Sequence, residues 1–221
     1  MATTYITSFI RIKNNQVLLN GELYFDTEAQ LHFADFIRAL YKQTAINYPK
    51  FYKMDDLSKL AILGASILLD KLEDSYDANE KSILLSNKSA SLDTDYKHQE
   101  AVNAGLASPA IFVYTLPNIC IGEIAIKYKI MGENAFFVSE QFQPKQLYTS
   151  TEILHQESKS LCSICGWVEY FQNDYELFLY TVEQKPQLNV NALKKMPIFT
   201  SLLENKGALI HHPKNIELLY K

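Results

Sequence analysis

The sequence predicts an α/β fold in which a mixed, mostly parallel sheet is flanked by helices, in the order β-α-β-α-β-α-β-β. Short continuous apolar runs at 82–86 and 135–138 are typical of buried strands. Apolar residues recur at helical spacing before and between these runs, at 57–68 and 115–130. A later segment, 162–183, predicts two strands joined by a short turn.

The N-terminal region predicts a hairpin followed by two helices. Strands at 5–12 and 16–19 flank Asn14-Asn15, and asparagine tolerates the left-handed conformation of a tight turn. Asp26 is placed to cap the first helix. The apolar residues of that helix fall on one face: Phe33, Phe36, Ile37, Leu40 and Tyr41. Small residues of the second helix would let a neighbouring element approach closely: Ala61, Gly64 and Ala65.

The second part of the chain continues this alternation. The polar segment 87–100 predicts a loop, and the helix at 115–130 is apolar nearly all round, so it needs cover on two sides. A helix from Pro144 to about Leu161 carries one polar flank, so we expect one side of it to be open. The remaining expected elements are strands at 162–171 and 175–183 and a short helix starting at Pro197.

Composition bounds the protein class. The chain has 221 residues, of which 48% are hydrophobic, and no repeat or linker, so we expect one domain over 1–221, with a core at about 5–183 and a C-terminal extension at 184–221. A net charge of −4 argues against a nucleic-acid partner. No apolar run is long enough for a membrane span, and the N-terminus resembles no signal peptide, so we expect a cytoplasmic protein.

Two groups of metal-type residues favour structural roles. Cys162 and Cys165 have redox or half-zinc spacing, but no second ligand pair accompanies them, so we expect reduced core cysteines. Asp93, Asp95 and His98 lack the glycine turn and terminal glutamate of a calcium loop. The seven glycines form no phosphate-binding loop. We therefore expect no metal and no cofactor.

One stretch carries a family resemblance. Ser108-Pro109 is followed by Asn118, a helix, Gly132 and the apolar strand at 135–138. This pattern resembles the central segment of a β-ketoacyl synthase, in which the strand delivers a nucleophilic cysteine to the next helix. Counting on from Gly132 puts the nucleophile position at Gln141. Upstream, Lys53-Met54-Asp55 before a long helix also fits the family.

The resemblance implies one half of the thiolase-like fold without the catalytic residues. It covers about residues 5–183, only the first half of a complete family member, and the second half is the one that carries both catalytic histidines. It is closest to the short N-terminal-domain proteins of aryl-polyene and flexirubin-type pathways. Because Gln141 replaces the cysteine, we assign no catalytic residue. The candidate substrate-binding residues are Ser108, Pro109, Asn118 and Gln141.

Three functions remain open at this point. The first is a non-catalytic accessory or dimerising subunit of type II fatty-acid or polyketide synthesis. The second is an enzyme that condenses acyl groups or decarboxylates malonyl-carrier protein through Gln141, with histidines from a partner chain. Drift to a polar residue at a degenerate position explains Gln141 better, because Glu140 and Phe142 also depart from the small residues that flank the nucleophile in the family. The third is a module that binds an acyl chain or small molecule in a pocket lined by 87–118.

The resemblance also implies partners. We expect a homo- or heterodimer with a ketosynthase-like subunit, which would cover the second side of the helix at 115–130. Acyl carrier protein is a further candidate partner.

Overall fold

The fold is taken from a computed structural model, which describes residues 3–27, 29–70, 76–184 and 209–221. The strands are β1 (Tyr5–Lys13), β2 (Gln16–Leu19), β3 (Glu22–Asp26), β4 (Lys81–Asn87), β5 (Asn134–Val138), β6 (Cys162–Phe171), β7 (Asp174–Glu183) and β8 (Leu209–Ile210). The helices are α1 (Phe33–Gln43), α2 (Asp56–Leu69), α3 (Leu92–Asn103), α4 (Pro109–Phe112), α5 (Ile119–Tyr128), α6 (Pro144–Gln156) and α9 (Pro213–Tyr220). Short 3-10 turns are η1 (Pro49–Lys53) and η2 (Ala78–Glu80).

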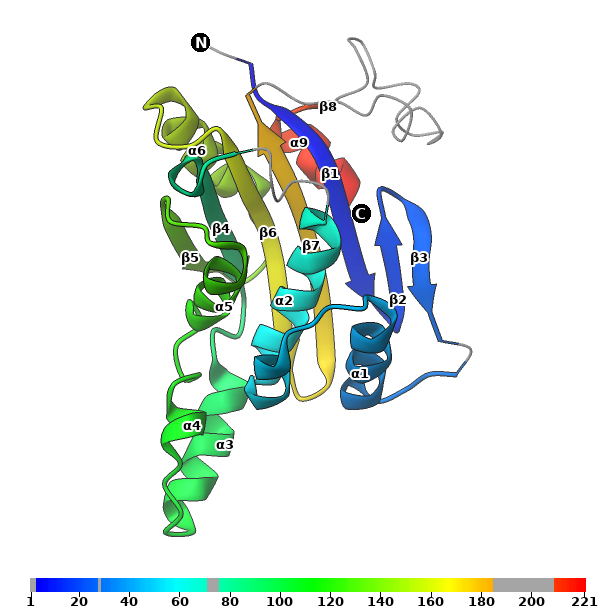
Figure 1. The fold of residues 1–221 in the computed structure, drawn as a ribbon, viewed down its shortest axis with the longest axis vertical. Coiled ribbons are helices and arrows are strands. Elements are labelled where there is room, and N and C mark those ends of the chain that lie inside the picture. The colour runs from blue at the N-terminus through cyan, green and yellow to red at the C-terminus, as the bar shows by residue number, and fades with distance from the viewer. Residues whose placement is uncertain (1–2, 28, 71–75, 185–208) are drawn as a thin grey trace.

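One sheet organises the described chain. Its strand order is β3-β2-β1-β7-β6-β4-β5, and β8 pairs with β1 (Figure 1). The predicted mixed α/β fold is confirmed. Parallel pairing is limited to β4 with β5 and β4 with β6, and the other pairs are antiparallel. The sheet is therefore less parallel than we expected, because hairpins join β1 to β2, β2 to β3 and β6 to β7, and a short hairpin connection forces antiparallel pairing.

Helices cover both faces of this sheet (Figure 1). On one face, α1, α2 and α5 bury the larger apolar cluster, which includes Leu60, Ile124 and Leu177. On the other face, α6 and α9 bury a second cluster, which includes Trp167 and Phe178. The two clusters are the expected result of a sheet whose side chains alternate between two covered faces.

The close approach predicted at α2 is confirmed. A methyl group on Gly64 would lie 2.4 Å from a side-chain carbon of Leu177, so β7 packs directly on the helix at this point. The turn between β1 and β2 also follows the prediction, because Asn14 and Asn15 have φ values of 51° and 61°.

Several boundaries differ from the predictions. The segment 87–100 is not a loop, because it contains most of α3, a polar helix whose one buried residue is Thr94. Asp26 ends strand β3, and α1 begins only at Phe33. Helix α6 ends at Gln156, where Ser158 adopts a φ of 56° and the backbone N–H of Lys159 donates to Leu154 O. The predicted helix at Pro197 lies outside the described residues.

Strand β5 was predicted as buried, but it is an edge strand of intermediate exposure. Helices α3 and α4 extend beyond the end of the sheet near it (Figure 1). None of the helices in the described ranges is both long and apolar enough to cross a membrane.

The end of the C-terminal extension packs on the core. Strand β8 pairs with the start of β1, and Ile216 and Leu219 of α9 enter the cluster that α6 covers. The ring of Tyr220 lies 4.6 Å from that of Phe142, centroid to centroid. The extension therefore covers part of the sheet face that α6 leaves open.

Candidate functional site

Gln141 lies where the sequence places it, in the loop that joins β5 to α6. Strands β4 and β5 are parallel, and the backbone N–H of Ser139 donates to Asn87 O at 2.9 Å, so this loop leaves the sheet beside the end of β4. The side chain of Gln141 is exposed. Its neighbour Phe142 is buried against the rings of Trp167, Phe178 and Tyr220, which anchors the loop.

The loop at 139–143 contains no cysteine, the nucleophile of a ketosynthase reaction. A glutamine amide is neutral and cannot attack a thioester, whereas a ketosynthase reaction needs a thiolate. The three cysteines are all buried, and burial raises the pKa of each thiol, to about 12 for Cys165. The prediction that Cys162 and Cys165 are core residues is thereby confirmed.

The other predicted site residues begin helices. Ser108 and Pro109 are the N-cap and first residue of α4, and Asn118 is the exposed N-cap residue of α5. Neither Ser108 nor Asn118 caps its helix with its side chain. Their roles as substrate-binding residues stay predictions.

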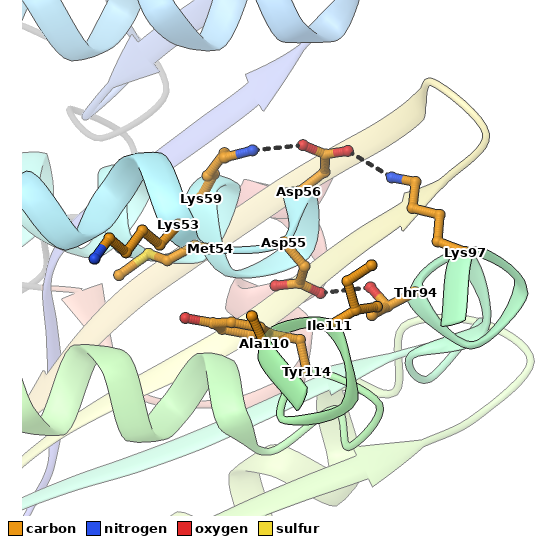
Figure 2. Close-up of a pocket in the computed structure, with 10 residues that line it drawn as sticks. All are labelled: Lys53, Met54, Asp55, Asp56, Lys59, Thr94, Lys97, Ala110, Ile111 and Tyr114. Carbon is orange, nitrogen blue, oxygen red and sulfur yellow. Dashed lines mark hydrogen bonds and ion pairs between the residues drawn. The ribbon is translucent and has the colours of Figure 1, made fainter. Parts of the chain in front are cut away.

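A cavity lies immediately beside α4, between that helix, α3 and the start of α2 (Figure 2). Its volume is about 200 Å³. The lining residues are Lys53, Met54, Asp55, Asp56, Lys59, Thr94, Lys97, Ala110, Ile111 and Tyr114. It therefore joins the family-like motif Lys53-Met54-Asp55 to the segment that follows Ser108-Pro109, but none of the four predicted binding residues lines it.

Asp55 is the most buried charge in this cavity. Its carboxylate caps α2 by accepting from the backbone N–H of Ser58 at 3.0 Å, and it also accepts from the hydroxyl of Thr94 at 2.9 Å. Burial raises the pKa of Asp55, although these hydrogen bonds oppose the rise. One oxygen thus caps α2, and the other joins α2 to α3.

The remaining charges of the cavity largely neutralise one another. Asp56 lies between Lys59 and Lys97, at 3.0 and 2.9 Å (Figure 2). Lys97 also contacts Asp93 at 2.7 Å. Burial would raise the pKa of Asp56, but the two lysines outweigh it and lower the value. Asp93 lies on the same helix as Lys97, so this ion pair spans one turn of α3.

A second buried carboxylate lies behind Tyr114. Glu123 of α5, only 3% exposed, accepts from the hydroxyls of Tyr114 and Tyr48 at 3.0 and 3.3 Å and pairs with Lys50 at 2.8 Å. Burial and this carboxylate raise the pKa of Tyr114. We did not predict this cluster, although a single glutamate within the apolar run Ile119–Tyr128 was a visible signal.

The sequence matches no protein-family model and no curated protein. Solved structures do match. A structure titled the ishigamide ketosynthase/chain length factor superposes with a TM-score of 0.63 at 15% identity, over 85% of this chain and 63% of that one. The chain has the fold of the ketosynthases.

Two further structures support this ketosynthase-like fold. One is a ketosynthase in complex with its chain length factor from Xenorhabdus doucetiae, with a TM-score of 0.58, 12% identity, and coverage of 100% of this chain and 91% of that chain. The other is a type II polyketide synthase acyl-carrier protein in complex with its ketosynthase. It superposes with a TM-score of 0.59 at 12% identity, over 88% of this chain and 65% of that chain. The ketosynthase-like chain thus spans less than two thirds of the first and third structures and nearly all of the second.

Proposed function

We propose that this chain is a non-catalytic subunit that pairs with a ketosynthase-like partner in fatty-acid or polyketide-type synthesis, of which aryl-polyene synthesis is the candidate pathway. The observation that supports pairing is the outer edge of β5. One edge of this strand pairs with β4, and its other edge pairs with no described strand. Large apolar side chains are exposed on and near it: Val138 (57%), Met131 (73%) and Ile126 (65%). An open edge with exposed apolar side chains favours contact with another chain.

Helix α5 supports the same surface. Ile121 and Ile124 of this helix are buried against the core, whereas Ile126 faces outward. Its second apolar side was the basis for expecting a covering subunit. On that side Ile130 is buried and Ile119 packs partly on the core, so Ile126 is the residue left exposed. A ketosynthase-like partner, with acyl carrier protein as a further candidate, would supply the missing cover.

The position of α9 disfavours an enzyme assembled with a partner's histidines. In a complete ketosynthase the helix equivalent to α6 lies between two sheets, and the second half brings the histidines. Here Tyr220 of α9 packs on Phe142, the residue after Gln141. A second half approaching Gln141 along this face would have to displace α9, so the accessory role accounts for the site better than decarboxylation does.

The acyl-binding alternative is also less well supported. The cavity beside α4 is partly lined by 94–114, as that hypothesis required. At about 200 Å³, however, it is smaller than the roughly 300–1,000 Å³ of ordinary ligand pockets. Its rim carries lysines and aspartates, which do not suit a long alkyl chain.

Pairing is tested by purification of the tagged chain from cells that express its natural partners. We expect a condensing enzyme with its own active-site cysteine to co-purify at a 1:1 ratio. Val138→Lys should reduce its recovery about tenfold or more, because a lysine on an edge strand opposes strand-to-strand contact. The matched control is Leu218→Lys, which places the same charge at an exposed apolar position on α9. Equal recovery with both variants would contradict the proposed surface.

Catalysis is tested separately with malonyl-carrier protein as substrate. We expect the chain alone to release no carbon dioxide above the uncatalysed rate, and we expect no change in Gln141→Ala. When the co-purified enzyme is present, its own rate is subtracted, and no excess should remain. Because Gln141 is exposed, that variant should also unfold at the same temperature as the natural chain. Steady release that disappears in Gln141→Ala would instead identify a decarboxylase.

A further inference from the structure

A separate and larger cavity lies near the C-terminal end of α2, whereas the cavity of Figure 2 adjoins its first residues. Its volume is about 380 Å³, and it is formed by the β2–β3 hairpin, the loop after α1, the last turn of α2 and the end of α5. This volume falls within the range of small-molecule sites. No part of the proposed pairing surface on β5 lines it.

The wall made by α2 favours positive charge. The carbonyl groups at a helix C-terminus carry partial negative charge, and a basic residue in the last turn commonly offsets it. Helix α2 has no basic residue in its last turn and ends instead at Asp70, a further negative charge. Asp70 makes no hydrogen bond or ion pair within the described part of the chain. Among the described residues, the cavity therefore holds a carboxylate without an ion-pair partner at the negative end of a helix.

The neighbouring side chains would receive an organic cation. Tyr24 lies close enough to Asp70 for that carboxylate to help raise the pKa of the tyrosine, after the larger effect of burial. An aromatic ring beside a carboxylate is a favourable setting for an ammonium group. Leu19, Ile46 and Ile67 supply apolar surface for the carbon skeleton of a ligand.

Lys127, near the end of α5, adds one positive charge to the lining of the cavity. Its ammonium donates to the hydroxyl of Tyr128 at 2.7 Å and lies 4.1 Å from the centre of that ring. A carboxylate on the ligand would be attracted by this ammonium group and repelled by Asp70.

We propose that this cavity binds a small organic molecule through its primary ammonium group, with Asp70 as the principal contact. The shared chemistry admits two sources, an alkyl amine and an amino acid. An amino acid carries a carboxylate and an alkyl amine does not. Comparing their affinities therefore shows whether a carboxylate on the ligand strengthens or weakens binding. The inference is independent of pairing at β5.

The test uses three probes of similar carbon skeleton, titrated into the full chain while amide NMR signals of the cavity loop, including Ala45 and Asn47, are followed. Isoamylamine carries only the ammonium group, L-leucine carries both charges and isovalerate carries only the carboxylate. We expect saturable shifts with isoamylamine or L-leucine, at roughly millimolar concentrations, and none with isovalerate. The stronger of the first two identifies the source.

Asp70→Asn should weaken binding of the preferred probe about tenfold. The matched control is Glu22→Gln, which removes an exposed carboxylate from β3 without altering the lining. A far-UV circular dichroism spectrum identical to that of the natural chain confirms that each variant is folded. Shifts that survive Asp70→Asn unchanged, shifts lost equally in Glu22→Gln, or no saturable shift with either ammonium probe would overturn the proposal.

Discussion

Gly132→Ala is expected to lower the free energy of unfolding by about 3 kcal/mol or more. A methyl group at this position would lie 2.2 Å from the carbonyl oxygen of Lys81 and 2.9 Å from that of Asn79. Neither oxygen can move easily, because the surrounding backbone is tied in hydrogen bonds. Met131 donates to Ala78 O at 2.9 Å, and Ile83 donates to Glu133 O at 3.1 Å. The added methyl would push β5 away from β4, and urea denaturation measures the loss.

Gly122→Ala is the matched control, because it adds the same methyl group within α5. No atom lies within 4 Å of the position that its Cβ would occupy. Alanine favours the helix over glycine by about 1 kcal/mol, so this variant should be slightly more stable than the natural chain. If both glycine variants change the free energy of unfolding by the same amount, the close approach at Gly132 does not exist.

Gly132 also illustrates what could be predicted from the sequence. Its place in the motif predicted the position of β5. Counting on from Gly132 predicted that Gln141 lies in the loop after this strand, and the structure has both where they were expected. Strand β4 and the hairpin of β1 and β2 were predicted because their apolar pattern or turn residues are local signals. Local agreement of this kind identified most of the sheet.

Elements held by polar or distant contacts were not predicted. The sequence predicts a loop where α3 lies, because the residues of this helix are polar and Thr94 is its one buried residue, so no apolar periodicity marks it. Strand β8 has two residues, and its pairing with β1 joins segments about two hundred positions apart. Such pairing leaves no trace in a local window, so the tail after 208 could not be assigned from its sequence alone.

The candidate site was predictable to the same extent. The sequence indicated the loss of the nucleophile at Gln141, but it could not show that α9 packs beside that loop. Nor could it show that Asp55 and Glu123 become buried, since burial depends on α2 and α5 meeting across the core. Side-chain burial is a property of the assembled fold and has no local signal in the sequence.

The C-terminal segment is expected to detach from the core on acidification. His211 is buried, and its Nδ1 lies 3.0 Å from Glu152 Oε1, while Thr4 donates to the same carboxylate. The rings of Tyr148 on α6 and Tyr180 on β7 also face His211, and its exposed neighbour is His212. Glu152 of α6, Thr4 of the N-terminus and His211 therefore join three distant segments.

The direction of the pH effect follows from the pKa values. Burial lowers the pKa of His211 below its ordinary value of 6.5, although Glu152 opposes this. The pKa of Glu152 is also lowered, because hydrogen bonds from His211 and Thr4 outweigh the effect of burial. Each group therefore binds protons more readily after the segment detaches. Docking is strongest above pH 6.5, weakens below it as His211 takes up a proton, and weakens further below pH 4.5 through Glu152.

Hydrogen exchange of the amides of Ile210 and His211 measures this detachment. After correction for the intrinsic rate, exchange at pH 5 should exceed that at pH 7 by about tenfold for each unit by which docking lowers the pKa of His211. His211→Gln should lose most of this dependence. The pH dependence that remains in this variant comes from His155 of α6. Burial lowers the pKa of His155 to about 4, so this residue stabilises the whole fold above pH 6.5. His212→Asn removes only the smallest contribution to the lowered pKa of His211 and leaves an asparagine that can still cap α9, so it should keep most of the pH dependence. If His211→Gln keeps it as well, protonation of His211 is not what releases the segment.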